Sequence, residues 1–209
     1  HDSNRPMLTA LLAGSSIQVV DGGLHRDDPD ALGQAIDQAA ACDVVFCSGG
    51  ASGSDADHVE RAILACGGEA RRVRLQLKPG KPIILGMLRD RPILGLPGNP
   101  VAAMVNFLLF GRPLLRATVS APPHCPVGQG AVAAEPFPHS RGRREFLPAR
   151  IVGHDADGRV RLAKLGRGGS ARLRPLATAD GLAEIAADRG DVAPDEAVRF
   201  HPFAALLTP

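Results

Sequence analysis

The order of apolar segments over the first 116 residues is the feature that most restricts how this chain can fold. Asp43–Cys47 is a nearly continuous apolar run, which is typical of a strand covered on both faces. A glycine-rich loop and a helical pattern follow it, and further strand and helix patterns come after those. This alternation predicts an α/β domain of three layers around a mainly parallel sheet.

Local signals place the elements of this domain. Asn4, Asp28 and Asn99 are candidate N-caps, each with a proline within the next two residues, where a helix tolerates the missing N–H. We expect helices over residues 4–14, 29–41, 58–66 and 101–116. We expect strands over residues 17–20, 43–47, 71–77, 82–88 and 92–96.

The residue composition and the hydrophobic pattern of the sequence change near residue 118. Residues 121–140 are rich in Pro, Gly and Ala and are expected to form a linker. Short alternating segments follow, and Asp157–Gly158 between two of them favours a hairpin. The expected strands cover residues 145–152, 159–165, 171–175 and 197–200. The sequence therefore predicts an α/β domain over 1–120, a linker over 121–140 and a small all-β domain over 141–209.

Composition excludes several classes of protein. There are 24 basic and 22 acidic residues, so bulk nucleic-acid binding is not expected and an anion site has to be built locally. No apolar run approaches the roughly 18 residues that a membrane span needs, and a signal peptide is not expected from the first residues given. The four cysteines show no metal-binding spacing and are expected to be core thiols in a reducing cytoplasm.

The loop Ser48–Asp57 follows the buried strand 43–47 and precedes a helix. Its small residues, among them Ser48, Gly49, Gly50 and Ser52, let backbone N–H groups approach a ligand closely. Ligands of open α/β sheets bind at the carboxyl ends of strands, where this loop lies. An ordinary flexible strand–helix connection is the alternative interpretation.

Two further loops also have residues that are typical of a ligand-binding site. In Lys78-Pro79-Gly80-Lys81-Pro82, prolines restrain a segment that holds two of the chain's three lysines. In Leu96–Pro100, a tight turn over Pro97, Gly98 and Asn99 leads into a helix with Pro100 at its first position. A solvated turn and a well-capped helix start are the alternatives.

Topology would bring these loops together. If strands 82–88 and 92–96 form a hairpin, Lys81 and Pro97 lie at one sheet edge, and a parallel strand 43–47 adds its glycine loop to that edge. The resulting cleft would suit a phosphorylated ligand with Mg²⁺, which takes one or two carboxylates with phosphate and water. Asp55, Asp57 and Asp27 (or Asp28) are the candidate ligands, although each is by default a surface carboxylate or a helix cap.

Taken together, these motifs resemble the MoeA/gephyrin family of molybdopterin molybdenumtransferases in order and spacing. The matching segments of residues 2–117 are Asp2-Ser3-Asn4-Arg5, Arg26-Asp27-Asp28-Pro29, Ser48-Gly49-Gly50 with Asp57, Lys78–Pro82 and Leu96–Pro100. The stretch from Gly169-Ser170 to Gly181 is similar to the family's C-terminal β domain. Members carry two more N-terminal domains and a strand before Asp2, so we expect this chain to be part of a longer protein.

The resemblance implies an α/β domain of the MogA-like molybdopterin-binding fold and a reaction. Adenylylated molybdopterin and molybdate would be the substrates, AMP would be released, and Mg²⁺ would assist. Asp57 and Asp27 would be catalytic and metal-binding, and Lys78 and Lys81 would hold molybdate or phosphate oxygens.

Further roles follow from the same resemblance. Residues of the three loops would bind the pterin substrate, with Pro97 and Pro100 shaping its cleft, and Ser170 and Arg143 would contribute from the β domain. His58 stands where the family usually has Tyr, and Pro148 stands where Arg is common. The resemblance also implies a homodimer in the cytoplasm and a possible MogA-like adenylyltransferase as partner.

Two other functions remain open at this point. A MogA-like molybdopterin adenylyltransferase shares the α/β fold and the glycine loop, but the appended β domain and the two proline-rich loops favour the molybdenumtransferase. A non-catalytic dimerisation or scaffold module is the other alternative, since a gephyrin homologue also serves as a scaffold.

Overall fold

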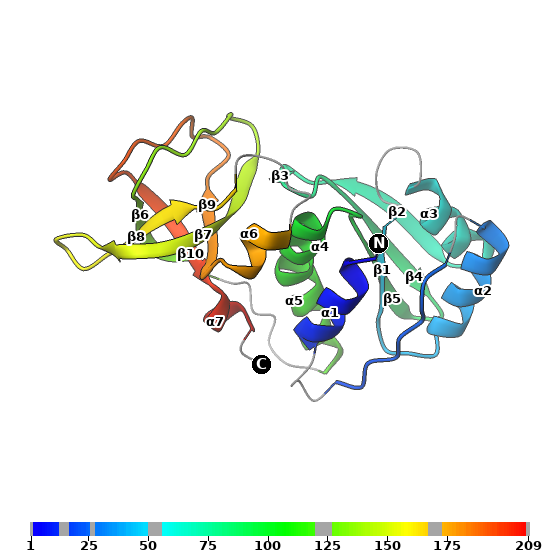
Figure 1. Ribbon diagram of the computed structural model, residues 1–209. Coiled ribbons are helices and arrows are strands. Elements are labelled where there is room, and N and C mark those ends of the chain that lie inside the picture. The colour runs from blue at the N-terminus through cyan, green and yellow to red at the C-terminus, as the bar shows by residue number, and fades with distance from the viewer. Residues whose placement is uncertain are drawn as a thin grey trace. The chain divides into compact units, whose positions relative to one another are not determined.

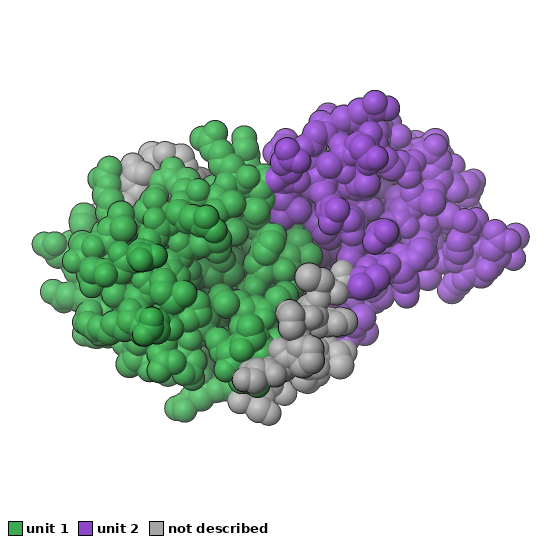
Figure 2. Space-filling model, turned by 180° about the vertical axis from the view of Figure 1, so that it is seen from behind, with its two compact units in different colours: residues 1–75, 80–124 green, residues 76–79, 125–209 purple. Residues whose placement is uncertain are grey.

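The computed structural model describes residues 2–12, 17–25, 28–49, 56–119, 127–166 and 173–207. It divides into two compact units, which Figure 2 colours separately. The first unit comprises His1–Leu75 and Gly80–His124, and the second comprises Gln76–Pro79 and Cys125–Pro209. Within the described residues, no helix combines the length and the apolar character needed to cross a membrane.

The first unit is built on a four-stranded sheet with the order β1-β5-β4-β2. Its strands are β1 (Val45–Ser48), β2 (Glu69–Arg74), β4 (Pro82–Leu88) and β5 (Arg91–Leu96). Only β1 and β5 are parallel, whereas β4 pairs antiparallel with both β5 and β2. The expected mainly parallel sheet is therefore wrong: the tight turn at Arg89–Asp90 imposes an antiparallel pair, because parallel strands need a long crossover.

Helices cover both faces of this sheet, so the three-layer α/β architecture is confirmed (Figure 1). The helices are α1 (Asn4–Leu12), α2 (Pro29–Ala39), α3 (Ala56–Ala65), α4 (Pro100–Asn106), the π-helix η1 (Phe107–Gly111) and α5 (Arg112–Thr118). On one face α2 and α3 pack against the sheet through Ile36 and Ile63. On the other face Leu8 of α1, Ala103 of α4 and Phe107 of η1 pack against it.

Three predicted elements of this unit differ from the structure. The strand expected over 71–77 spans Glu69–Arg74, and Leu77 pairs in the second unit instead. The single helix expected over 101–116 is divided into α4, η1 and α5. Pro113 has no N–H with which to continue an α-helical ladder, and the local change to π-helix precedes it. Residues 17–20 form no strand, because no described strand pairs with them.

The second unit is a β structure whose pairings close on themselves. Its strands are β3 (Leu77–Lys78), β6 (Gln129–Ala133), β7 (Arg144–His154), β8 (Val160–Lys164), β9 (Gly181–Ile185) and β10 (Ala197–Pro202). They follow the order β3-β7-β8-β6-β10-β9, and β9 also pairs with β7. Five strands thus form a closed ring, which leaves few free edges, and β3 is added to β7 from the segment between β2 and β4.

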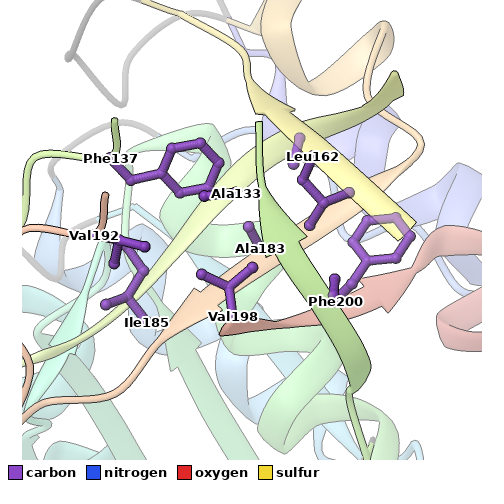
Figure 3. Close-up of a cluster of buried hydrophobic side chains, with 10 residues drawn as sticks. Ala133, Phe137, Leu162, Ala183, Ile185, Val192, Val198 and Phe200 are labelled. Carbon is purple, nitrogen blue, oxygen red and sulfur yellow. The ribbon is translucent and has the colours of Figure 1, made fainter. Parts of the chain in front are cut away.

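Large and small side chains alternate in the core of this unit (Figure 3). Phe137, Leu162 and Phe200 are fully buried and pack with the small Ala133 and Ala183. Burial of each large side chain contributes about 1.5–3 kcal/mol. This cluster gives the second unit a hydrophobic core of its own.

Two predictions for this half differ in detail. Gln129–Ala133 lies within the expected linker but forms β6. The strand expected over 171–175 is wrong where it is described, because Leu173–Ala177 forms the short helix α6. Pro175 within it could not donate to a strand ladder. A second short helix, α7, spans Phe203–Leu207.

Candidate functional site

The side-chain amide of Asn4 joins chain segments that are far apart in the sequence. Its Nδ2 donates to Ser48 Oγ at 2.6 Å and to the Gly98 carbonyl at 2.9 Å, with a longer contact of 3.4 Å to the Pro97 carbonyl. Asn4 is buried at the start of α1. One amide therefore connects the Asp2–Arg5 segment, the end of β1 and the loop after β5.

The orientation of this amide follows from its neighbours. Carbonyl oxygens only accept hydrogen bonds, so the nitrogen of Asn4 must face Pro97 and Gly98. Its Oδ1 is then directed elsewhere, and this buried oxygen has no hydrogen-bond partner within the described residues. A buried acceptor without a partner indicates a place that water or a ligand group completes.

The strand register brings the predicted loops to one sheet edge. Ser48 and Leu96 are partners at the ends of β1 and β5, and the Gly49 N–H donates to the Leu96 carbonyl at 3.2 Å. A β-carbon on Gly98 would lie 3.6 Å from Cα of Gly49, so the two loops pass close together. Because β4 and β5 are antiparallel, Lys81 at the start of β4 lies at this edge too. In the first unit, Ser48–Gly49 and Pro97–Gly98 therefore lie side by side, and Lys81 stands at the same edge.

A pocket of about 310 Å³ opens at this edge. It is lined by Asp2, Ser3, Asn4, Leu24, Ser48, Gly49 and Gly98. Both carboxylate oxygens of Asp2 accept hydrogen bonds from Arg5, one from its backbone and one from its guanidinium. The described lining is thus neutral or acidic, with hydroxyl and amide groups and one exposed leucine.

The loop Leu96–Pro100 is the best-defined part of the predicted site. Asn99 caps α4, since its Oδ1 accepts from the Ala102 N–H at 3.1 Å, and Pro100 is the first helical residue. Pro97 is buried and Gly98 is exposed. The predicted capping is confirmed, and it fixes the backbone that faces the pocket.

The two lysines of the Lys78–Pro82 loop have different surroundings. Lys78 belongs to β3 of the second unit, where its Nζ lies 2.9 Å from Oε1 of the buried Glu145. Lys81 belongs to the first unit and is exposed, and no ion pair joins it to another described residue. Of the two, Lys81 is the cation that is open to an anionic ligand.

Several predicted site residues lie outside the described residues: Asp27, Gly50, Ser52 and Ser170. Asp57 belongs to the first turn of α3, but its side chain is not described. Arg143 is exposed just before β7, and its carbonyl oxygen lies 2.9 Å from Nε2 of the buried His139 ring. Among the described residues, no three His, Cys, Asp or Glu side chains lie close enough to hold one metal ion.

Sequence reasoning missed two buried polar residues that hold the predicted loops. Glu145 pairs with Lys78, and Asn106 donates to the carbonyl of Gly80 at 3.3 Å. Each leaves one buried oxygen that has no hydrogen-bond partner in the described part of the chain, as Asn4 does. A single Asn in the otherwise apolar run Val101–Phe110 was the available signal for Asn106. The role of Glu145 depends on strand register and had no comparable signal.

Comparison with models of known protein families gives a match for each of the two units. Residues 1–117 match the family described as the probable molybdopterin binding domain. Residues 130–203 match the MoeA C-terminal region, domain IV. The two matches correspond to the α/β half and the β half of the chain.

Relatives with assigned functions are similar over nearly the whole chain. Molybdopterin molybdenumtransferase 2 of Mycobacterium tuberculosis is 33% identical over 199 residues, which are 92% of this chain and 48% of that protein. The molybdopterin molybdenumtransferase of Haemophilus influenzae is 30% identical over 213 residues, 99% of this chain and 51% of that protein. This chain therefore spans about half the length of these relatives.

Solved structures agree with the sequence matches. The molybdopterin biosynthesis moea protein from Pyrococcus horikosii has a TM-score of 0.77 at 28% identity. The match covers 97% of this chain and 48% of that one. The fold of both units therefore recurs together in one known chain.

Proposed function

This chain belongs to the probable molybdopterin-binding domain family, and on that premise we propose that it forms the substrate-binding half of a molybdopterin molybdenumtransferase. Its role would be in molybdenum cofactor biosynthesis. The substrates would be adenylylated molybdopterin and molybdate, and the reaction would release AMP while the dithiolene takes up molybdenum. The relatives that carry this name are twice as long.

The observation that supports the proposal most is the Asn4 amide, which holds together the end of β1 and the loop after β5 beside a pocket. The carboxyl ends of strands are where open α/β sheets bind ligands. The pocket residues Ser48, Gly49 and Gly98 offer small side chains and backbone groups, as a flat heterocycle requires for close approach. The exposed Lys81 lies at the same edge and would attract an oxyanion.

The proposed catalytic residues are those that the sequence places around this edge of the sheet. Asp57 and Asp27 are the proposed acidic residues, and Lys81 would stabilise negative charge on the transferred groups, where preorganised electrostatics carries much of the catalysis. Lys78 is a weaker candidate, since Glu145 already neutralises it. Ser170 and Arg143 would contribute from the β domain.

Mg²⁺ is proposed as the metal, with Asp57 and Asp27 as its ligands. When bound, it would supply Lewis-acid stabilisation of the adenylate phosphate. The described residues do not form this site by themselves, and the two aspartate side chains are outside them. A homodimer, a cytoplasmic location and delivery of the substrate by a MogA-like adenylyltransferase complete the proposal, and all three rest on the family resemblance.

An AMP-release assay tests the proposal. The full-length protein that contains this chain is incubated with adenylylated molybdopterin, molybdate and MgCl₂, and AMP is quantified by chromatography. Asp57→Asn should slow AMP release by about a hundredfold, since removal of one transition-state stabiliser typically costs that much. Omission of Mg²⁺ should have a similar effect.

A matched control uses the same chemical change at the other end of the sheet. Asp90 is exposed in the turn between β4 and β5 with a positive φ that asparagine adopts readily, so Asp90→Asn should keep full activity. AMP release that is equal in Asp57→Asn and in the unmodified chain would contradict the assignment of Asp57. Turnover of Mg-ATP on molybdopterin without molybdate would instead identify an adenylyltransferase.

A further inference from the structure

Asn106 is a fully buried polar residue on an otherwise apolar helix. It ends α4, where Val101 to Val105 are all buried, and η1 follows it. Its Nδ2 donates to the Ala102 carbonyl at 2.8 Å and to the Gly80 carbonyl at 3.3 Å, while its Oδ1 has no hydrogen-bond partner among the described residues. A buried amide that uses only its donor half costs folding free energy, so its presence calls for a reason other than stability.

The contact with Gly80 is close. Gly80 has a φ of +102°, and a β-carbon there would lie only 2.0 Å from Nδ2 of Asn106. The loop backbone thus rests directly on the amide, and both the backbone conformation and the lack of space require glycine. Asn106 therefore contacts the Gly80–Lys81 peptide group directly and restrains its position.

Two hydrogen bonds then hold the backbone around Lys81. The Gly80 carbonyl, held by Asn106, belongs to the peptide that contains the Lys81 nitrogen. On the other side, the Lys81 carbonyl accepts from the Leu75 N–H at 2.7 Å. The start of the exposed Lys81 side chain is fixed by bonds on both sides of its Cα.

The same helix also carries the loop that borders the pocket. The Ala102 N–H is bonded by the cap residue Asn99, and the Ala102 carbonyl is bonded by Asn106. One short helix thus connects the Pro97–Asn99 turn on its first turn with the Gly80–Lys81 peptide at its end. A shift at Asn106 would move Lys81 relative to the pocket edge.

We propose that Asn106 is a positioning residue, which fixes the Gly80–Lys81 peptide against α4 and so places the Lys81 ammonium group for a tetrahedral oxyanion. The identity of that oxyanion rests on the proposed function, in which it is molybdate or the phosphate of the adenylate. Asn106 itself touches no ligand. Its contribution is the placement of a charge.

Asn106→Leu separates this role from a purely structural one. Leucine has a similar volume, and removal of the unpaired buried oxygen offsets the loss of the donor, so the thermal unfolding temperature should change little. The Gly80 carbonyl loses its donor, so amide hydrogen exchange in residues 76–82 should accelerate. Affinity for tungstate, used as the probe for molybdate and measured by calorimetry, should fall about tenfold, because small misplacements of binding groups are costly.

Controls decide between the possible outcomes. Met104→Leu, a volume-conserving change on the same helix, should alter neither exchange nor affinity, and Asn106→Ala serves if the leucine variant does not fold. Parallel titration with phosphate shows which oxyanion Lys81 prefers. Unchanged exchange in residues 76–82, or unchanged tungstate affinity beside a binding wild type, would overturn the role of Asn106 alone. A wild-type chain that binds neither ion overturns both this inference and the oxyanion site of the proposed function.

Discussion

The ammonium group of Lys78 lies 2.9 Å from Oε1 of Glu145, and the two residues are register partners across β3 and β7. The Glu145 side chain is only 5% exposed, whereas that of Lys78 is 46% exposed. A buried carboxylate depends on its partner far more than an exposed ammonium group does. Lys78 therefore stabilises the second unit, a role that the sequence motif did not indicate.

Lys78→Met should destabilise the second unit by about 1–3 kcal/mol, because it leaves the carboxylate of Glu145 buried with one ionic partner fewer. The double variant Lys78→Met with Glu145→Gln should recover part of that loss, since the uncompensated charge is removed. Urea unfolding of the wild type, both single variants and the double variant measures the coupling. Strict additivity, within about 0.5 kcal/mol, would show that the ion pair contributes nothing.

Asn4→Asp should be more damaging than Asn4→Ala, although aspartate has nearly the same shape. A carboxylate would face the carbonyl oxygen of Gly98 without a hydrogen to donate, whereas alanine only removes the donor. We expect alanine to cost about 1–3 kcal/mol and aspartate more. Thermal unfolding ranks the variants, and AMP release should fall in the same order, because the loops around the pocket separate.

If Asn4→Asp proved as stable as the wild type, the amide would not be holding the two loops. Asn99→Asp provides the comparison, since Asn99 also lies at the start of a helix but uses its Oδ1 to accept a hydrogen bond. Aspartate satisfies the same backbone N–H there, so a much smaller effect is expected. The contrast depends only on whether the side chain donates or accepts.

The parts of the fold that local chemistry determines were predictable. Asp28 and Asn99 accept backbone hydrogen bonds as helix caps, and the hairpin of β4 and β5 follows from a short polar turn between apolar runs. From those elements, the meeting of Ser48, Lys81 and Pro97 at one edge could be deduced, because strand direction alone decides it.

Features that depend on distant partners were not predictable. Residues 17–20 have the sequence pattern of a strand. A strand also needs a neighbouring strand to pair with, and the local pattern does not show whether one is present. β9 (Gly181–Ile185) is buried on every residue, so it shows no alternation to detect. The cap predicted at Asn4 is wrong: its Oδ1 accepts no hydrogen bond within the described residues, and its Nδ2 donates to Ser48 and Gly98 instead.

Acid should destabilise the second unit through Glu184. The hydrogen bond from His201 at 2.6 Å, and the nearby charges of His201 and Arg144, hold the pKa of Glu184 below its ordinary value of 4.5. The folded state therefore binds this proton less readily than the unfolded state. The resulting stability is present above about pH 4.5 and is lost as the pH falls through the lower folded value.

Chemical unfolding at a series of pH values between 6 and 3 measures this contribution. The wild type should lose stability more steeply than Glu184→Gln, which cannot titrate at this position. At pH 6 the variant should be the less stable of the two, and the difference should shrink as the pH falls. Parallel curves for the two proteins would mean that Glu184 is no source of the acid sensitivity.

The thiol of Cys47 should be nearly inert in the folded chain. It precedes Ser48 in β1 and packs against the core formed with α2 and α3, and this burial raises its pKa to about 11. Since the thiolate is the reactive form, alkylation by iodoacetamide at pH 8 should be about a hundredfold slower than in the unfolded chain, as expected for a pKa about two units above normal. Mass spectrometry of the Cys47 peptide gives the rate, and Asn4→Ala should increase it, because loss of the bond to Ser48 loosens the end of the strand. Alkylation at the same rate in the folded wild type and in denaturant would show that β1 is open at this edge.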